Sequence, residues 1–271
     1  MGIAGLIALN VGMGLMMLPK ILRLMGLDPQ YKGKEYDLNG KKALIITTSH
    51  GSMGSTKKKT GVYASEMTVP YYAFLDANMA VDLASIEGHM IPIEPISLKY
   101  PLATLADKRF LSDKEFKNKV KNALKIDDLN FENYDLIFIA GGWGAAYDLG
   151  VSEVLGRKIT AANAKRIILG SVCHGALGFL KAKEINGEPL VKDKKITAVT
   201  NRQIKELNIQ VTPMHPETEL RKKGAEFMSN TACKDIFANL TVVDGNIVTG
   251  QNQNAASETA QKMMKKLAEK V

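Results

Sequence analysis

The sequence predicts an α/β protein whose sheet is mostly parallel and covered by helices on both faces. From Tyr36 onward, short apolar runs alternate with segments of helical periodicity. The apolar runs are continuous rather than alternating, as expected of strands that are buried on both faces. With 271 residues and 45% hydrophobic content, the chain can hold one large domain of this class or two small ones.

Each element of this fold has its own signal in the sequence. The strands are rich in branched apolar residues, and the last helix is amphipathic. Pro70 falls in the first turns of a helix, where proline is tolerated, and Asp244-Gly245 predicts a hairpin turn. We expect strands at 41–49, 79–85, 135–142, 166–172 and 196–200, a hairpin at 241–250, and helices at 65–78, 114–126, 154–165, 176–182 and 257–270.

Charge and cysteine content exclude several classes of protein. The net charge is +8, but the basic clusters are dispersed and do not alternate with aromatic residues, so we expect no nucleic-acid partner. The two cysteines, Cys173 and Cys233, form no C-x-x-C pair and no Cys/His cluster. This indicates neither a disulfide framework nor a metal site, and it favours a reducing compartment.

Residues 1–35 form an N-terminal apolar segment ahead of a domain at 36–271. No charged residue occurs before Lys20, and Arg23 follows. The run lacks the basic start and cleavage site of a signal peptide, and as a helix it is marginal for crossing a bilayer. We expect residues 1–25 either to anchor the protein at a membrane or to pack as a helix on the domain or in a dimer. Basic residues after the run favour a cytoplasmic domain.

Three expected strand ends carry chemically suggestive residues, and ligands of parallel sheets bind at the carboxyl ends of strands. They are TTSHG at 47–51, AGGWG at 140–144 and GSVCHG at 170–175. In the last of these, Cys173 lies between a strand and a helix, at a turn that would expose its sulfur. The nearby helix N-terminus favours a thiolate nucleophile. The alternative is a buried structural cysteine.

Two further features fit a reactive Cys173. The glycines of AGGWG leave backbone N–H groups open, so Gly142 and Trp143 are candidate oxyanion donors, although such a turn can also bind nothing. Glu66 opens a helix and is either a functional carboxyl group or a partner of the helix dipole. Two adjacent anions raise each other's proton affinity. A thiolate at Cys173 therefore requires that Glu66 hold its proton and donate a hydrogen bond.

Taken together, the motifs resemble the PfpI/ThiJ superfamily, the class I glutamine amidotransferase-like group with a flavodoxin-like, doubly wound sheet. Within it, the chain is most similar to the longer, chaperone-like glyoxalase III branch, where the glycine motif reads G-G-H-G and Trp143 here replaces the histidine. The resemblance covers the chain from about residue 40 to its end. The motifs that carry it are ALIITTS, SEMTVPYYAF, VDLAS, IFIAGGWGAAYDL, GSVCHGALGFL and VVDGNIVTGQNQNAA.

The resemblance implies roles for individual residues. Cys173 matches the nucleophile at a strand-to-helix elbow, His174 the adjacent histidine, and Glu66 the glutamate that hydrogen-bonds the cysteine. Gly142 and Trp143 match the oxyanion loop.

Four further positions follow from the same resemblance and from location. A third, usually acidic residue orients the histidine; Asn201 aligns with it, and Glu206 is the nearest acidic alternative. His50, at the end of the first strand, and His215, in a loop near the pocket mouth, are candidate substrate contacts.

The resemblance also implies an activity. It is the cysteine-dependent conversion of 2-oxoaldehydes such as methylglyoxal to 2-hydroxy acids in stress response and detoxification, without glutathione, metal or other cofactor. Two alternatives stay open: a cysteine amidase or peptidase, and a non-catalytic holdase or redox sensor. The expected partners are a small-molecule aldehyde and, because such domains often pair, a second copy of the chain.

Overall fold

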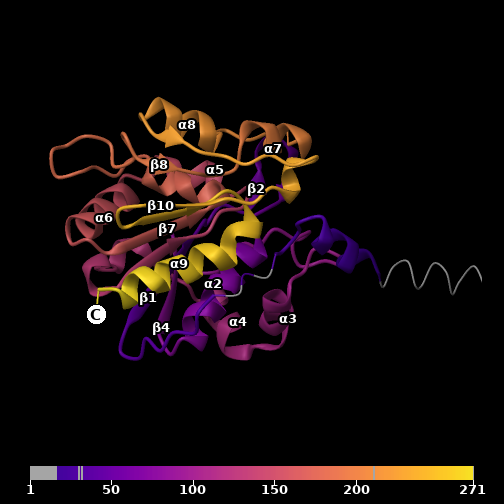
Figure 1. The fold of residues 1–271 in the computed structure, drawn as a ribbon, viewed down its shortest axis with the longest axis horizontal. Helices are drawn as coiled ribbons and strands as arrows, with labels where there is room; N and C mark the ends of the chain where they lie inside the picture. The colour runs from indigo at the N-terminus through magenta and orange to yellow at the C-terminus, as the bar shows by residue number, and fades with distance from the viewer. Residues whose placement is uncertain (1–16, 30, 32, 210, 271) are drawn as a thin grey trace, which may run out of the picture.

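A computed structural model of the chain describes residues 17–29, 31, 33–209 and 211–270. Within these residues, a seven-stranded sheet with the order β10-β11-β7-β6-β1-β4-β5 runs through the middle of the molecule (Figure 1). Neighbouring strands are parallel except for the β10–β11 hairpin. The strands are β1 (Lys42–Thr47), β4 (Ala80–Ser85), β5 (Leu124–Lys125), β6 (Leu136–Ile139), β7 (Ile168–Val172), β10 (Thr241–Asp244) and β11 (Ile247–Gly250), with two short pairs outside the sheet, β2 (Ser52–Met53) with β3 (Lys58–Lys59) and β8 (Lys195–Ile196) with β9 (Glu226–Phe227).

Helices cover both faces of the sheet. Helices α2 and α9 lie on one face, with α3 and α4 beside them (Figure 1), and α6 and η5 pack on the other. The helices are α2 (Ala64–Asp76), α3 (Leu105–Ser112), α4 (Lys114–Lys121), α5 (Ala145–Asp148), α6 (Glu153–Ala164), α7 (Asn201–Glu206), α8 (Pro216–Lys222) and α9 (Ala256–Ala268), with the 3-10 turns η1 (Gly54–Thr56), η2 (Ile126–Asp128), η3 (Phe131–Asn133), η4 (Leu149–Val151), η5 (Cys173–Phe179), η6 (Asp235–Phe237) and η7 (Gln253–Ala255).

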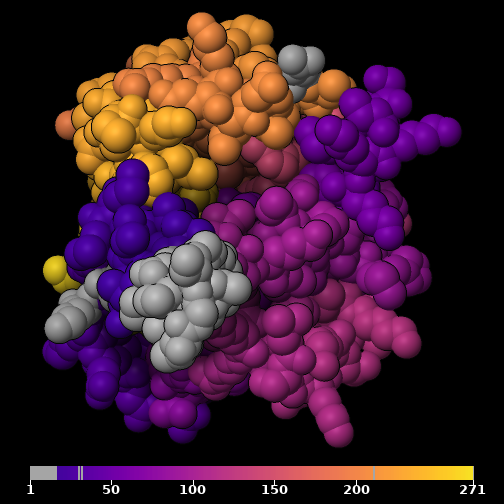
Figure 2. Space-filling model, turned by 90° about the vertical axis from the view of Figure 1, so that its right-hand side faces the viewer, coloured from indigo at the N-terminus to yellow at the C-terminus, as the bar shows by residue number. Residues whose placement is uncertain are grey.

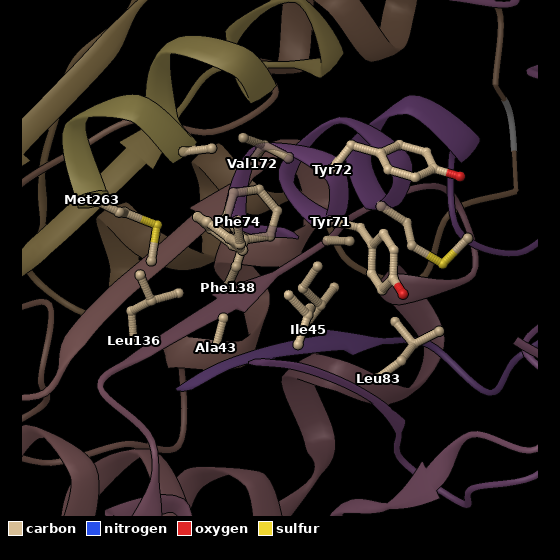
Figure 3. Close-up of a cluster of buried hydrophobic side chains, with 14 of the residues drawn as sticks. Ala43, Ile45, Tyr71, Tyr72, Phe74, Leu83, Leu136, Phe138, Val172 and Met263 are labelled. Atoms are coloured by element: carbon tan, nitrogen blue, oxygen red, sulfur yellow. The ribbon is translucent and has the colours of Figure 1, made fainter. Parts of the chain in front are cut away.

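The two-sided covering explains the continuous apolar runs. Along β1, Ala43 and Ile45 pack into the cluster under α2 and α9, whereas Leu44 and Ile46 pack into the cluster under α6. Figure 3 shows the first cluster, in which Phe74 of α2 lies over Phe138 of β6. Because successive side chains of a strand point to opposite faces, every position must be apolar when both faces are buried. The predicted α/β class with a doubly wound, mostly parallel sheet is confirmed.

Two predicted elements were wrong. Residues 196–200 do not form a strand of the central sheet, since only Lys195–Ile196 pairs, and it pairs with β9. The edge of β11 that such a strand would need is taken by β10. The predicted helix at 176–182 is instead the 3-10 helix η5, which begins at Cys173. Gly175 and Gly178 weaken an α-helix there.

The described part of the N-terminal segment packs on the domain. Residues 17–24 are helical, Leu27 is buried, and the Asp28 N–H donates to Asn254 Oδ1 at 3.0 Å. In Figure 2 this indigo segment lies between the yellow C-terminal part and the magenta part around residue 100. No helix in the described part of the chain is long and apolar enough to span a membrane. Most of the predicted anchor, residues 1–16, lies outside the described residues.

Candidate active site

Three neighbouring strands bring the three motifs to one edge of the sheet. From β1 the chain moves outward through β4 and β5, then returns to place β6 and β7 on the other side of β1. The carboxyl ends of β1, β6 and β7 therefore lie side by side at a point where the winding direction changes. This is the position where doubly wound sheets bind ligands. AGGWG follows β6, and Cys173 directly follows β7.

Cys173 occupies a strained turn between β7 and η5. Its φ is +55°, in the left-handed region that non-glycine residues rarely adopt. The turn is held tightly against β6, because a Cβ built on Gly175 would lie 2.1 Å from the Ile139 carbonyl oxygen. The resulting elbow holds the cysteine at the strand ends, 8% exposed.

His174 and Glu66 contact Cys173 from different elements. The Sγ atom lies 3.5 Å from His174 Nδ1. Glu66, in the first turn of α2, is hydrogen-bonded to the Cys173 thiol, and its Oε2 accepts the Gly141 N–H at 2.9 Å. A Cβ on Gly141 would lie 2.6 Å from Glu66 Oε2, so a glycine is required for this approach. The structure thus brings Glu66 against Cys173 and His174, which lie more than 100 residues further along the chain.

Burial sets the protonation of this group. Desolvation raises the pKa of Glu66 from 4.5 to about 8, even though hydrogen bonds from Cys173 and Gly141 favour the carboxylate. Burial and the adjacent Glu66 raise the pKa of Cys173, while the N–H groups of His174 and Gly142 oppose that rise. Burial, with a smaller contribution from His215, lowers the pKa of His174 to about 3. At pH 7 the site therefore holds a neutral His174 and a Glu66 that is protonated because it is buried, and not because a thiolate lies beside it. The Cys173 group is a thiol at rest, not the thiolate that the helix N-terminus alone suggested.

The expected oxyanion positions lie beside the sulfur. Gly142 has a φ of +96°, and its N–H is hydrogen-bonded to Cys173. The ring of Trp143 packs edge-on against His174, with centroids 4.9 Å apart.

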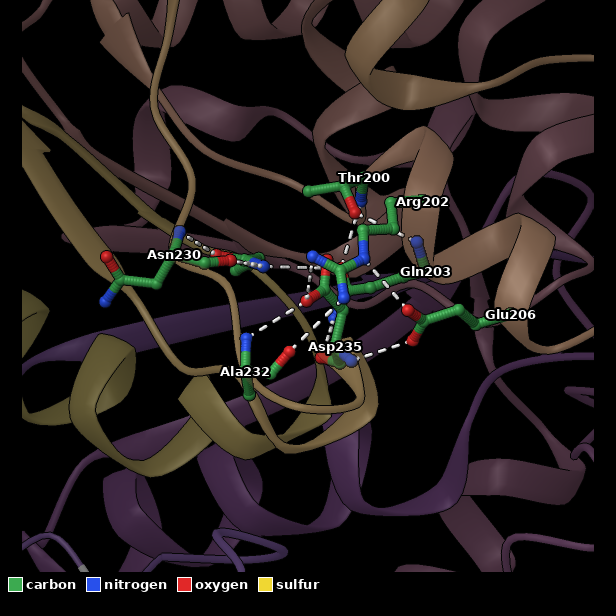
Figure 4. A network of polar contacts seen from close by, with 8 residues as sticks. Thr200, Arg202, Gln203, Glu206, Asn230, Ala232 and Asp235 are labelled. Atoms are coloured by element: carbon green, nitrogen blue, oxygen red, sulfur yellow. Dashed lines mark hydrogen bonds and ion pairs between the residues drawn. The ribbon is translucent and has the colours of Figure 1, made fainter.

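Neither residue expected to orient His174 does so. The Asn201 side chain is exposed and bonds Thr218 at 2.9 Å, and Glu206 accepts from Arg202 and from the Asp235 N–H (Figure 4). His174 Nε2 has no hydrogen-bond partner among the described residues. The expectation fails because the two side chains bond other segments: Asn201 bonds Thr218 of α8, and Glu206 bonds the 232–235 loop.

The two histidines expected to contact substrate, His50 and His215, are not part of the cavity wall around Cys173. His50 stacks on Tyr147, with ring centroids 4.1 Å apart, and its backbone N–H donates to Thr48. His215 immediately precedes α8 and contributes to the lowered pKa of His174. Within the described residues, no group of three or more His, Cys, Asp or Glu could hold a metal ion.

The main feature that the sequence did not reveal is a cavity of about 350 Å³ above Cys173. Tyr63, immediately before α2, lines it next to Glu66. The rest of its wall comes from segments around residues 96–102, 199–209 and 236–253. No local motif marks these residues, because they converge only when the loops fold over the sheet edge.

A parallel sheet, a strained cysteine elbow and a buried carboxyl group beside it define a class of α/β proteins with a cysteine at the nucleophile position. The DJ-1/PfpI family model matches residues 58–266, and the chain belongs to this family. The resemblance inferred from the motifs is thereby confirmed.

Several relatives of known name cover most of the chain. Glyoxalase 3 of Candida albicans is 31% identical over 80% of this chain and 94% of its own length. A protein of Schizosaccharomyces pombe named glutathione-independent glyoxalase hsp3101 is 31% identical, over 83% and 95%. The crystal structure of glyoxalase III from Candida albicans superposes with a TM-score of 0.74 at 30% identity, covering 83% of this chain and 96% of that one. The Rapid Encystment Protein of 24 kDa from Francisella tularensis gives a TM-score of 0.78 at 33% identity, covering 84% and 99%.

Proposed function

We propose that this protein converts 2-oxoaldehydes such as methylglyoxal to 2-hydroxy acids, with Cys173 as nucleophile and without a cofactor. The observation that carries the proposal is the contact of Cys173 with a neutral His174 and a protonated Glu66 at the floor of a cavity. Two full-length relatives named glyoxalases support it.

The chemistry needs one nucleophile and two proton carriers. The thiol adds to the aldehyde carbon: the S–C bond forms, the carbonyl π electrons move to oxygen, and His174 passes the thiol proton to that oxygen. His174 then takes the proton of this carbon while Glu66 protonates the neighbouring ketone oxygen, which gives an enediol. His174 returns its proton to the second carbon and Glu66 recovers one from the first hydroxyl, leaving a thioester. Water hydrolyses the thioester, which releases the 2-hydroxy acid and the free thiol.

The backbone around the elbow supports the first step. The N–H groups of Gly142 and His174 already face the sulfur, and that of Trp143 follows in the same turn. We assign Gly142 and Trp143 to hold the oxygen that becomes charged as the thiol adds.

The decisive experiment measures lactate formed from methylglyoxal with no added thiol. Wild type should turn over, Cys173→Ser should lose at least about a hundredfold in kcat/KM, and Glu66→Gln should lose a similar factor, typical of a proton-transfer group. Equal inactivity of wild type and Cys173→Ser at millimolar substrate would overturn the proposal.

The alternative functions make different demands on Cys173. A redox sensor needs an accessible thiol with a lowered pKa, whereas burial raises the pKa of Cys173, so the site disfavours that role. An amidase or peptidase would accumulate an acyl-enzyme with amide substrates, which mass spectrometry would detect as an added mass on Cys173.

For the N-terminal segment we propose attachment of residues 1–25 to the cytoplasmic surface of a membrane. The described helix at 17–24 exposes Met17, Ile21 and Leu24 beside Lys20, a combination of apolar and basic groups that suits an anionic bilayer surface. The full chain should sediment with anionic vesicles and a chain starting at Tyr36 should not; equal behaviour of the two would refute this. Pairing with a second copy stays a prediction, which sedimentation analysis would check.

A further inference from the structure

The cavity above Cys173 has an apolar wall. Cys173, His174 and Glu66 lie together at one part of it. The lining also includes aliphatic side chains from three separate segments of the chain: Ile96, Leu102, Val199, Leu207, Ile209 and Ile236. Trp143 and Tyr63 complete the lining next to the reacting groups.

Within the described residues, the cavity wall contains no lysine or arginine. The one histidine in it, His174, is neutral at pH 7 because burial lowers its pKa to about 3. A phosphate or carboxylate on a substrate would therefore find no cation there, and it would lose its hydration without compensation.

Two of the amide side chains in the wall are already engaged by the protein. Gln203 donates to the Asp235 carbonyl at 2.7 Å and accepts from the Thr200 N–H at 3.0 Å, within the network of Figure 4. Asn252 donates to the Ala238 carbonyl at 2.9 Å and accepts from the Asn254 N–H at 3.0 Å. These groups hold the loops in place and are not available to hydroxyl groups of a substrate without loss of those bonds.

The space also exceeds what methylglyoxal needs. At about 30 Å³ per water molecule, 350 Å³ has room for roughly ten waters. The methyl group of methylglyoxal would leave most of the apolar wall in contact with water. A longer apolar substituent would displace that water and bury more apolar surface.

We infer that this cavity selects 2-oxoaldehydes with an uncharged apolar substituent of several carbons, alkyl or aryl, over methylglyoxal and over charged 2-oxoaldehydes. The inference rests on the proposed function for the chemistry of the reacting end. What it adds is a statement about the size and polarity of the substituent that the substrate carries.

Turnover of a homologous series tests the selection. For 2-oxopropanal, 2-oxopentanal and 2-oxoheptanal, kcat/KM should rise about threefold per methylene, and so by about eightyfold over the four methylenes that separate the first from the last. Phenylglyoxal should also exceed 2-oxopropanal, and a chain as long as 2-oxoheptanal that ends in a carboxylate should fall below it. Turnover of 2-oxopropanal with no gain along the series would overturn this inference and leave the proposed function intact. No turnover of any 2-oxoaldehyde would overturn the proposed function.

A matched pair of variants ties the preference to the cavity wall. Leu207 is 41% exposed and lines the cavity, whereas Leu124 is 42% exposed and lies on β5, away from it. Leu207→Gln should lower the ratio of kcat/KM for 2-oxoheptanal to that for 2-oxopropanal by about threefold or more, and Leu124→Gln should leave it unchanged. A ratio is independent of the fraction of folded enzyme. The same ratio in both variants would contradict the assignment.

Binding without chemistry provides an independent measurement. Trp143 is the only tryptophan of the chain and lines the cavity, so its fluorescence reports occupancy. In Cys173→Ala, hexanamide should change this fluorescence at concentrations at least about tenfold lower than acetamide, and lower than the monoamide of adipic acid, which adds a carboxylate at the far end. Equal affinity for the three probes would refute an apolar, uncharged site whether or not the enzyme turns over 2-oxoaldehydes.

Discussion

Glu66 is a carboxyl group that keeps its proton at neutral pH because it is completely buried. In the unfolded chain it ionises near pH 4.5, but in the folded protein only near pH 8. Between these values the unfolded state has lost a proton that the folded state keeps. Stability therefore falls as the pH rises through this range, and the contribution present below pH 4.5 is lost above about pH 8.

Replacing Glu66 with glutamine should remove this pH dependence. One unit of pKa corresponds to about 1.4 kcal/mol, so Glu66→Gln should be close to wild type at pH 5 and more stable by a few kcal/mol at pH 8. Urea unfolding at both pH values measures this, with the exposed Glu226→Gln as control. Parallel stability curves for wild type and Glu66→Gln would contradict a raised pKa.

The same residue should shape the pH dependence of activity. Because Glu66 acts as an acid, kcat/KM should fall as the pH rises through about 8. His174 stays neutral down to about pH 3, so its protonation should cause no loss between pH 7 and 5. A pH profile of initial rates checks both limbs. A rate that rises through pH 8 would instead make Glu66 a base.

At the scale of elements, the turn between β6 and α5 positions the backbone N–H groups that contact Cys173 at the elbow. Gly142 has a positive φ, and a Cβ there would lie 2.4 Å from the Gly61 carbonyl oxygen and 2.4 Å from the Tyr63 nitrogen. The turn that presents backbone N–H groups to Cys173 is thus pressed against the loop that leads into α2. Glycine is required by both the backbone conformation and the space.

Gly142→Ala should cost at least about 2 kcal/mol of stability and most of the activity. Gly187 provides a matched control, since its φ is +85° but no atom lies within 4 Å of an added Cβ. Gly187→Ala should cost only the backbone strain, about 1 kcal/mol, and keep full kcat/KM. Unfolding curves and rates for both variants distinguish crowding from strain, and equal losses would show that the space around Gly142 does not matter.

At the scale of the whole molecule, the described N-terminal segment is part of the packed structure. Leu27 is 7% exposed, and Asp28 bonds Asn254 just before α9. This contact joins positions 226 residues apart. The segment therefore stabilises the fold as well as presenting an apolar helix to its surroundings.

Removing this packing should destabilise the domain. A chain that starts at Tyr36 should unfold with a free energy lower by about 2–3 kcal/mol than one that starts at Met17, mainly because the buried Leu27 is lost. Leu27→Ala in the full chain should reproduce most of the difference. Urea denaturation of the three proteins tests this, and equal stability would place the segment outside the folded unit.

How well the sequence predicted a feature of this fold depends on whether local or long-range interactions determine that feature. Strands at β1, β6 and β7 were predictable because burial on both faces favours a run of apolar and small residues. The segment at 196–200 has the same composition but forms no strand of the sheet, because β10 already occupies the edge of β11. Whether such a segment becomes a strand depends on the strand with which it can pair, and composition does not reveal that pairing partner.

The sequence by itself determined which residues are candidates for the reacting group. Cys173 and Glu66 were marked by a strand-to-helix turn, glycines and a helix start, which are local features, and the family resemblance added His174. Only the tertiary structure decided their protonation and the surface that a substrate meets. The raised pKa of Glu66, the lowered pKa of His174 and the position of Asn201 away from the elbow depend on what distant segments bury. The apolar cavity likewise exists only where loops distant in the sequence come together, because desolvation and shape are properties of the packed molecule.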